Sequence, residues 1–341
     1  MTTLDILTAG PAVTVQDLGR PGHIAHGLTR GGAMDRLALY EAAALLAQPV
    51  TAALEMVGLG GTFRVSHDTR IALTGAPMSA TCDGEALSWH GSHTLPAGAE
   101  LRIGGVRSGA IGYLTFAGGI ASEPMLGAQA AHLTASLGHA LSAGDSLTLH
   151  TDPGGPTDQT LPPDDRFQGG EVAATTSLQS HLFGAETLHR FTTTRFTRDA
   201  RANRQGIRLN PDGAGFAAAG GLRIVSEIIV PGDIQITGDG APYVLMCESQ
   251  TTGGYPRIAT VLPSELPRVA QTPLGADIRI RLLDPEAAIA HERTARAAKR
   301  TLPQRVTPRI RDPHTMRDLL SYRLIDGAIS ATHDPFEGAP I

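Results

Sequence analysis

The sequence predicts a mainly β protein made of two β-rich halves and a charged tail. Its 341 residues include 40 glycines and 23 prolines but only 4% aromatic residues, which suits short strands and tight turns better than a helical bundle. Short apolar segments recur along both halves, and residues 151–170, rich in Asp, Pro, Gly and Thr, are the best boundary between them. A chain of this length is also comfortable for two domains of ordinary size.

The first half is expected to hold short strands and one helix. The helix follows Asp35, a good N-cap residue, and ends at Pro49. Leu37, Tyr40 and Ala44 fall on one face of it. The predicted strands are Thr2–Leu7, Ala12–Val15, Thr62–Val65, Arg70–Leu73, Glu100–Ile103, Ala110–Phe116 and Ser146–His150.

The second half repeats this style. In its last predicted strand apolar residues alternate with arginines, so one face is expected to be buried and the other exposed. A short helix is predicted near Pro263 and a longer one over residues 285–300. From residue 301 onward, proline and arginine interruptions indicate a tail that packs on the domain or on a partner. The predicted strands are Leu222–Val230, Asp233–Ile236, Tyr243–Cys247 and Asp277–Leu283.

Composition and charge exclude several partners. The net charge of −5 gives no reason to expect nucleic acid or an anionic membrane. No apolar run reaches membrane-spanning length, and the N-terminus lacks a basic-then-apolar signal pattern. Cys82 and Cys247 lie far apart, which favours two buried thiols in a reducing compartment over a disulfide. We therefore expect a soluble cytoplasmic protein.

Lysine chemistry is almost absent from the sequence. Lys299 is the one lysine, and it lies in Arg293–Arg300, which has the pattern of an exposed helix. A biotinyl-lysine, a Schiff-base lysine and a lysine-containing phosphate loop are therefore not expected, and no covalent biotin is assigned to this chain. The arginines of residues 293–311 are most simply a solvated or partner-facing surface.

Two stretches place polar groups beside glycines. They are Val15–Gly22, with the sequence VQDLGRPG, and Gln250–Pro256, with the sequence QTTGGYP. This composition is typical of a loop at the mouth of a sheet or barrel, where backbone N–H groups can face a ligand.

These stretches belong to an ordered set of motifs that spans roughly residues 4–284. The set resembles the allophanate hydrolase subunit 2 family, whose members are also called KipA-like proteins or C-type subunits of 5-oxoprolinase. The motifs that carry the resemblance are Val15–Gly22, Gly32–Ala38, Ala53–Glu55, Tyr113–Ile120, Gly206–Leu209, Ser226–Glu227, Val230–Gln235, Gln250–Pro256 and Gln271.

The resemblance implies two cyclophilin-like β-barrel subdomains, assigned to residues 1–165 and 171–284, with a helical or irregular tail over residues 285–341. The same module forms part of the carboxyltransferase domain of biotin-dependent urea carboxylase. Standalone members act with a KipI-like protein, the B-type subunit of 5-oxoprolinase, and that enzyme also has a larger A-type subunit. It opens the 5-oxoproline lactam to glutamate at the expense of ATP, so ATP with Mg²⁺ is expected, shared with or supplied at partner subunits.

We therefore expect a subunit of an ATP-dependent amidohydrolase that acts on 5-oxoproline or a related lactam or ureido compound. Two alternatives stay open. One is a carboxyltransferase or allophanate-hydrolase-type subunit of a urea carboxylase system, and the other is a non-catalytic KipA-like regulatory module. The family usually carries a Ser-Arg-Ser-Thr segment where this chain has Ala128–Ala131. Losing an arginine and three hydroxyls removes anion and amide contacts, which affects the substrate more than the fold.

Lactam opening requires activation of a weakly electrophilic amide, either by phosphorylation of its oxygen or by stabilisation of the oxyanion formed on attack, and neutral donors and a positioned arginine suit that task. Threonine hydroxyls and successive backbone amides can hold a carboxylate or phosphate, and glutamine amides can hold a lactam or ureido group. The predicted catalytic residues are Asp17, Arg20 and Glu248. The predicted substrate-binding residues are Gln16, Gln235, Gln250, Thr251, Thr252, Gly253, Tyr255 and Gln271.

Each of these residues also has a purely structural interpretation. The Gly253–Gly254 pair suits a hairpin turn, and Asp17 suits a cap of the turn at Gly19, paired to Arg20. Glu248, like Glu55, suits acid–base chemistry only if burial raises its pKa. No metal site is predicted, because the pairs His23/His26 and His90/His93 lack carboxylate or cysteine ligands at typical spacing.

Overall fold

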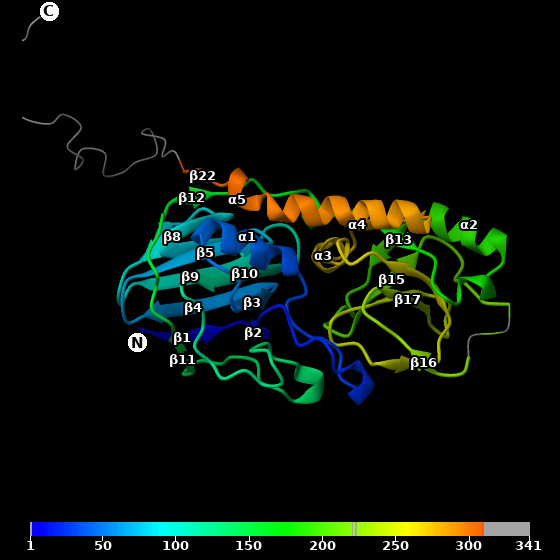
Figure 1. The fold of residues 1–341 in the computed structure, drawn as a ribbon, viewed down its shortest axis with the longest axis horizontal. Helices are drawn as coiled ribbons and strands as arrows, with labels where there is room; N and C mark the ends of the chain where they lie inside the picture. The colour runs from blue at the N-terminus through cyan, green and yellow to red at the C-terminus, as the bar shows by residue number, and fades with distance from the viewer. Residues whose placement is uncertain (1, 220, 222–223, 310–341) are drawn as a thin grey trace, which may run out of the picture. The chain divides into compact units, whose positions relative to one another are not determined.

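Strands dominate the structure, which confirms the mainly β class. It is a computed structural model that describes residues 2–219, 221 and 224–309 (Figure 1). Residues 2–307 belong to one compact unit, and the description below concerns that unit.

The first half consists of two antiparallel sheets. One has the order β11-β1-β4-β9-β6-β7, and the other contains the order β2-β3-β10-β5-β8-β12. The strands of the first sheet are β1 (Thr2–Ala9), β4 (Leu59–Val65), β6 (Met78–Cys82), β7 (Glu85–Ala86), β9 (Glu100–Val106) and β11 (Ser146–Leu149). Those of the second are β2 (Val13–Gln16), β3 (Ala53–Val57), β5 (Thr69–Gly75), β8 (Gly91–Leu95), β10 (Ile111–Phe116) and β12 (Gln159–Thr160).

One apolar core lies between these sheets. Leu4, Phe63 and Leu101 enter it from the first sheet, and Leu73 and Leu114 enter it from the second. Every residue of β5 and β10 is buried, because the core covers one face of these strands and α1 packs on the other.

The predicted first helix is present as α1 (Arg36–Leu46), and its N-cap is Asp35, whose side chain accepts from the backbone N–H of Ala38. It ends at Ala47, which adopts the left-handed conformation two residues before Pro49. The face predicted to hold Leu37, Tyr40 and Ala44 is half-buried, while the deeper face holds Ala38, Leu39, Ala42, Leu45 and Leu46.

The second half is a closed barrel with the order β13-β20-β17-β18-β15-β14-β21. Its β21 confirms the predicted alternation, since Ile278 and Ile280 are buried and Arg279 and Arg281 are exposed. Closure comes from the pairing of β13 with β21, which is parallel, whereas the other pairs are antiparallel. The strands are β13 (Gly170–Thr175), β14 (Phe196–Arg198), β15 (Gly206–Pro211), β17 (Asp233–Ile236), β18 (Pro242–Leu245), β20 (Arg257–Val261) and β21 (Asp277–Leu283).

The remaining elements are short, apart from α4, which runs past α3 in Figure 1 and is followed directly by α5. They are η1 (Ile24–His26), η2 (Leu133–Ala135), η3 (Arg166–Gln168), η4 (Ser180–Leu182), α2 (Ala185–Thr193), α3 (Leu266–Gln271), α4 (Pro285–Arg300), α5 (Leu302–Arg305), and the strands β16 (Glu227–Ile228), β19 (Thr252–Gly253) and β22 (Thr307–Pro308). In the described ranges no helix has the length and apolar character needed to cross a bilayer.

The strand predicted over Leu222–Val230 is largely wrong, and its residues 222–223 lie outside the described residues. Only β16 forms there, because Val225 and Ile228 point into solvent, 87% and 63% exposed, instead of packing in a core. Several real strands escaped prediction, among them β8 and β15, since glycine and polar residues interrupt their apolar pattern. Of the tail predicted over residues 285–341, the part from 310 onward lies outside the described residues.

We predict that His90 makes stability pH-dependent. His90 is 8% exposed, and burial, with repulsion from Arg166, lowers its pKa to about 4, against weaker attraction from Asp164 and Asp35. Between pH 6.5 and 4 the unfolded chain binds a proton that the folded chain does not, so stability falls as the pH is lowered through this interval.

Replacing His90 by Asn, which tolerates the positive φ of 55° at this position, should remove up to roughly 3 kcal/mol of that pH dependence. Urea denaturation of both proteins at a series of pH values measures it. Parallel stability–pH curves for the two proteins would contradict the assignment.

Candidate functional site

The loop that follows β2 is fastened to the segment Ala128–Ala131. The Gln16 side-chain amide donates to the carbonyl of Ala131 at 3.1 Å and to the hydroxyl of Thr14 at 3.0 Å. Asp17 accepts from the backbone N–H of Gly19 and of Gln129, both at 2.7 Å. The structure therefore places Asp17 as a cap between two loops, as the structural interpretation expects.

Arg20 is buried beside the same segment, with 1% of its surface exposed. Its Nε donates to the carbonyl of Met125 at 3.2 Å and its Nη2 donates to the carbonyl of Ala130. These carbonyls, and not the expected ion pair with Asp17, hold the guanidinium. Its Nη1 has no partner in the described part of the chain, and a Cβ at Gly31 would lie 3.4 Å from it. Arg20 is thus a buried cation with a free donor.

Arg204 joins the two halves of the molecule. It pairs with Glu55 on β3 and, at 2.5 Å, with Glu248 beyond β18, and it donates to the carbonyl of Gly32 at 2.7 Å. The backbone N–H and the hydroxyl of Thr134 both donate to Glu248 at 3.1 Å. This cluster brings together a loop of the first half and a loop of the barrel.

Glu248 does not meet the condition expected of an acid–base group. Burial opposes its ionisation, but the charge of Arg204 and its hydrogen bond outweigh that effect and hold the pKa of Glu248 below its usual value. The same carboxylates raise the pKa of Arg204 against the cost of burial. Both groups stay ionised at neutral pH, and the polar contacts of Glu248 are made within the chain.

His132 belongs to this cluster although no sequence signal marks it, since a lone histidine in an alanine-rich segment has no motif. Its Nε2 lies 3.1 Å from the hydroxyl of Thr29, and its Nδ1 lies 3.8 Å from Glu248. Burial lowers the pKa of His132, with Glu248 acting in the opposite direction. The ring also lies next to Gly31, opposite the free Nη1 of Arg20.

The Gln250–Pro256 stretch forms the rim of the barrel. Thr252 and Gly253 form β19, which pairs with β16, and the carbonyl of Thr251 accepts from the backbone N–H of Ile229. Gln250 and Thr252 are exposed, and Tyr255 is 42% exposed, so these side chains are accessible. The loop that leads into the rim contacts the first half, because the backbone N–H of Gly31 donates to the carbonyl of Cys247.

Gln235, on β17, lies under this rim and is 7% exposed. Its side-chain Nε2 has no partner among the described residues, and a Cβ at Gly253 would come within 2.5 Å of it. A side chain at position 253 would therefore have to displace the Gln235 amide. Arg257, which the sequence did not single out, braces the rim through ion pairs with Glu227 at 2.6 Å and Asp233 at 3.2 Å.

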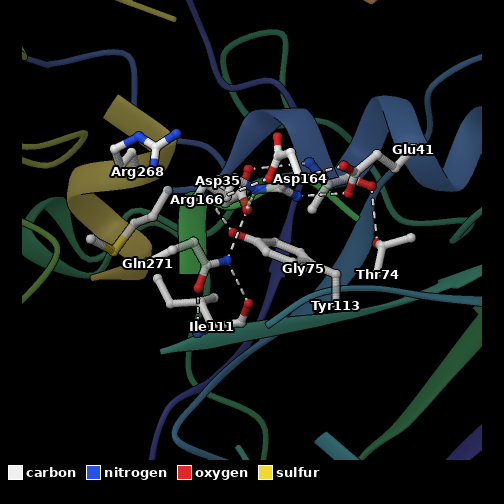
Figure 2. A network of polar contacts seen from close by, with 12 residues as sticks. Asp35, Glu41, Thr74, Gly75, Ile111, Tyr113, Asp164, Arg166, Arg268 and Gln271 are labelled. Atoms are coloured by element: carbon white, nitrogen blue, oxygen red, sulfur yellow. Dashed lines mark hydrogen bonds and ion pairs between the residues drawn. The ribbon is translucent and has the colours of Figure 1, made fainter. Parts of the chain in front are cut away.

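Gln271 lies elsewhere, between the two halves, as Figure 2 shows. Its amide donates to Asp35 and to the carbonyl of Ile111, both at 2.8 Å, and accepts from the backbone N–H groups of Ala110 and Ile111. It is fully buried, and its amide is engaged within the chain, so it does not join the rim residues.

Arg166 anchors the network of Figure 2. It donates to Asp35 at 2.9 Å, to Glu41 at 2.7 Å and to Asp164 at 2.7 Å. Burial raises the pKa of Glu41, and the charge of Arg166 opposes this. The network fixes η3 and α3 against α1, which positions the barrel on the first half.

Cys247, the possible metal ligands and the cavities give no sign of a second reactive site in the described residues. Burial raises the pKa of the Cys247 thiol to about 12, so it is unreactive at neutral pH. Within the described residues no group of three His, Cys, Asp or Glu side chains is arranged to hold a metal ion. Three cavities lie beside α1 and α4, and none of the predicted site residues lines them.

Comparison with known proteins identifies the family. The family model described as "Carboxyltransferase domain, subdomain A and B" matches residues 26–282. This chain belongs to that family. The resemblance found from the motifs is thereby confirmed.

Three relatives of this carboxyltransferase-domain chain show its range. The C subunit of Escherichia coli 5-oxoprolinase is 32% identical over 284 residues, which cover 81% of this chain and 89% of that protein. The urea amidolyase of Saccharomyces cerevisiae is 25% identical over 311 residues, 84% of this chain but 17% of that protein. The crystal structure of Kluyveromyces lactis urea carboxylase matches with a TM-score of 0.79 at 22% identity, over 91% of this chain and 31% of that chain. The chain thus has nearly the full span of the bacterial protein and less than a third of the fungal enzymes.

We predict that Arg204→Met costs about 3–5 kcal/mol of stability, because it leaves Glu55 and Glu248 as buried carboxylates without their cation. Urea denaturation followed by circular dichroism measures the loss. Arg201→Met is the matched control, since Arg201 is exposed and pairs with Asp199 at the surface, where an ion pair contributes little. Equal denaturation midpoints for the two variants would show that Arg204 does not hold the halves together.

Proposed function

We propose that this chain is the C-type subunit of a 5-oxoprolinase that opens the lactam of 5-oxoproline to L-glutamate with ATP, and that it acts with partner subunits. The observation that carries the proposal is the 32% identity to the C subunit of Escherichia coli 5-oxoprolinase along 89% of that protein. A subunit named C implies other subunits, and we propose a B-type partner at the shared site and an A-type subunit in the full assembly.

The accessible rim is proposed to bind substrate. Gln250 and Thr252 are exposed, and an amide and a hydroxyl can both donate and accept, as a lactam requires. Tyr255 adds a half-exposed ring beside them. The buried amide of Gln235 keeps a free donor under Gly253 within the described chain, which suits a ligand oxygen that reaches past the glycine.

Asp17, Arg20, Gln16 and Glu248 are proposed as positioning residues. Their contacts include loop residues between Met125 and Thr134, and their side chains lie largely inside the protein. The buried guanidinium of Arg20 keeps one N–H group without a partner in the described chain, and we propose that its positive potential stabilises negative charge that develops on a carbonyl oxygen of the substrate.

ATP would supply a phosphoryl group that activates the lactam oxygen. The rim offers donors but no cluster of carboxylates for Mg²⁺ within the described residues, so we place the metal-bound nucleotide outside the rim. Because the sequence has a single lysine, any contribution of this chain to holding the phosphates falls mainly to arginine and backbone amides.

The relationship to urea amidolyase favours a second candidate, a carboxyltransferase-type subunit of a urea carboxylase system. The lysine content of the chain requires the biotin to be on another chain. Urea-stimulated carboxyl transfer from carboxybiotin on a separate carrier would select this candidate.

We predict ATP-dependent formation of glutamate from 5-oxoproline by the assembly of this chain with A-type and B-type subunits, and none by this chain alone. Coupled detection of ADP and glutamate measures it. Absence of ADP release with 5-oxoproline and with a series of related lactams and ureido compounds, from a complex that co-purifies, would refute the proposal.

Within that assembly, Thr252→Val should lower kcat/KM for 5-oxoproline by about tenfold, because one hydrogen bond to a polar substrate atom is lost. Thr193→Val, an exposed threonine on α2, is the control for the same change outside the rim. If both variants keep the wild-type kcat/KM, Thr252 does not contact the substrate.

A further inference from the structure

A groove with a volume of about 870 Å³ lies between α1 and α4, on a different part of the molecule from the rim. Glu292 is the only acidic residue among those that line it, in the part of the chain described by the structure. The protein as a whole is acidic, with a net charge of −5, so this concentration of positive charge is local. The cationic residues of the groove are Arg30, Arg36, Arg293, Arg296, Lys299 and Arg300.

Among the described residues these cations have no carboxylate partner. No carboxylate oxygen of that part of the chain lies within 4.0 Å of any of them, whereas Arg166, Arg204 and Arg257 each pair with at least two carboxylates. Arg30 is fixed by donation from its Nε to the carbonyl of Leu18 at 2.7 Å. Lys299 is fixed with its ammonium 4.2 Å from the centre of the Tyr40 ring. The groove therefore holds positioned cations that are not neutralised by ion pairs within the described chain.

Arg36 is placed where a cation is electrostatically unfavourable. It is the first residue of α1 after the N-cap, at the positive end of the helix dipole. Burial lowers the pKa of Arg36, and the charge of nearby Arg30 lowers it further, against weaker opposing effects that include attraction by Glu292. An anion between these two guanidinium groups would offset both effects.

A neutral donor completes the groove. The hydroxyl of Ser264 lines it, is buried, and has no partner among the described residues. Arg293, Arg296 and Arg300 follow a spacing of three and four residues along α4, so they lie along one side of the helix. Guanidinium groups bind phosphate oxygens in pairs, and the volume of the groove is in the range of small-molecule sites.

We propose that this groove binds a ligand that carries a chain of phosphate groups, of the class of a nucleoside triphosphate. The identification of the ligand as a nucleotide rests on the proposed ATP-dependent function. The preference for phosphate groups rests on the cations of the groove alone. An acidic protein segment is the rival occupant, and the test separates the two.

The test measures binding to the full chain by isothermal titration calorimetry at low ionic strength without Mg²⁺, with ATP, tripolyphosphate, adenosine and a poly-glutamate peptide. ATP and tripolyphosphate should bind saturably and adenosine should not. The double variant Arg36→Gln/Arg296→Gln should weaken binding by at least about tenfold, because hydrogen bonds to charged groups are lost. Arg279→Gln removes the same charge from an exposed position on β21 and should leave binding unchanged.

Melting temperatures confirm that the variants are folded, and Arg296→Gln alone, on the exposed face of α4, replaces the double variant if that protein does not fold. Failure of tripolyphosphate to bind, equal binding by all variants, or binding of poly-glutamate alone overturns the proposal. An assembly that does not open lactams, with phosphate binding that still depends on Arg36, refutes only the proposed function. An active assembly whose double variant keeps the wild-type KM for ATP refutes only the groove.

Discussion

The structure depends on one buried cation, Arg204, which lies in the barrel half and binds a carboxylate from each half. Glu55 comes from a strand of the first half and Glu248 from a loop of the barrel, and both are almost completely buried. Without the guanidinium both carboxylates would be buried without their cation, which is strongly destabilising. The two halves are therefore coupled by charge, beyond the apolar surface they bury together.

From Glu55 the hydrogen bonds continue into a network that crosses the interface between the two halves. Glu55 accepts from the Tyr113 hydroxyl at 2.6 Å, and the Tyr113 hydroxyl oxygen in turn accepts from the backbone N–H of Asp35. Asp35 in turn binds Arg166 and Gln271. A buried polar network of this kind adds little net stability, but it penalises every alternative placement of the halves, since any shift leaves a charge or an amide unpaired. Cys247 and Glu248, just before the rim, contact loops of the first half, so the placement of the rim depends on this docking.

Sequence reasoning found the elements whose signals are local. Asp35 as an N-cap and the alternation in β21 follow from rules of spacing and capping, and both are present. It did not find what only the fold creates. His132 and Arg257 carry no motif, and they become important because distant segments bring Glu248 and Asp233 to them. The same limit applies to Gln271, whose amide satisfies the chain's own backbone, a role that cannot be separated from substrate binding in the sequence alone.

Nearly all basic residues of this protein are arginines, and two of their settings differ: buried ion pairs and a groove lined by cations. At Arg166 and Arg204, carboxylates occupy the guanidinium donors from more than one side. Planar groups with fixed donor directions suit such positions better than a flexible ammonium group. Along α1 and α4 the guanidinium groups face a groove in which Glu292 is the only acidic lining residue of the described chain. Arg166 and Arg204 are thus neutralised within the chain, whereas the cations of the groove have no ion pairs in the described residues, so this positive charge is open to an anion from outside the chain.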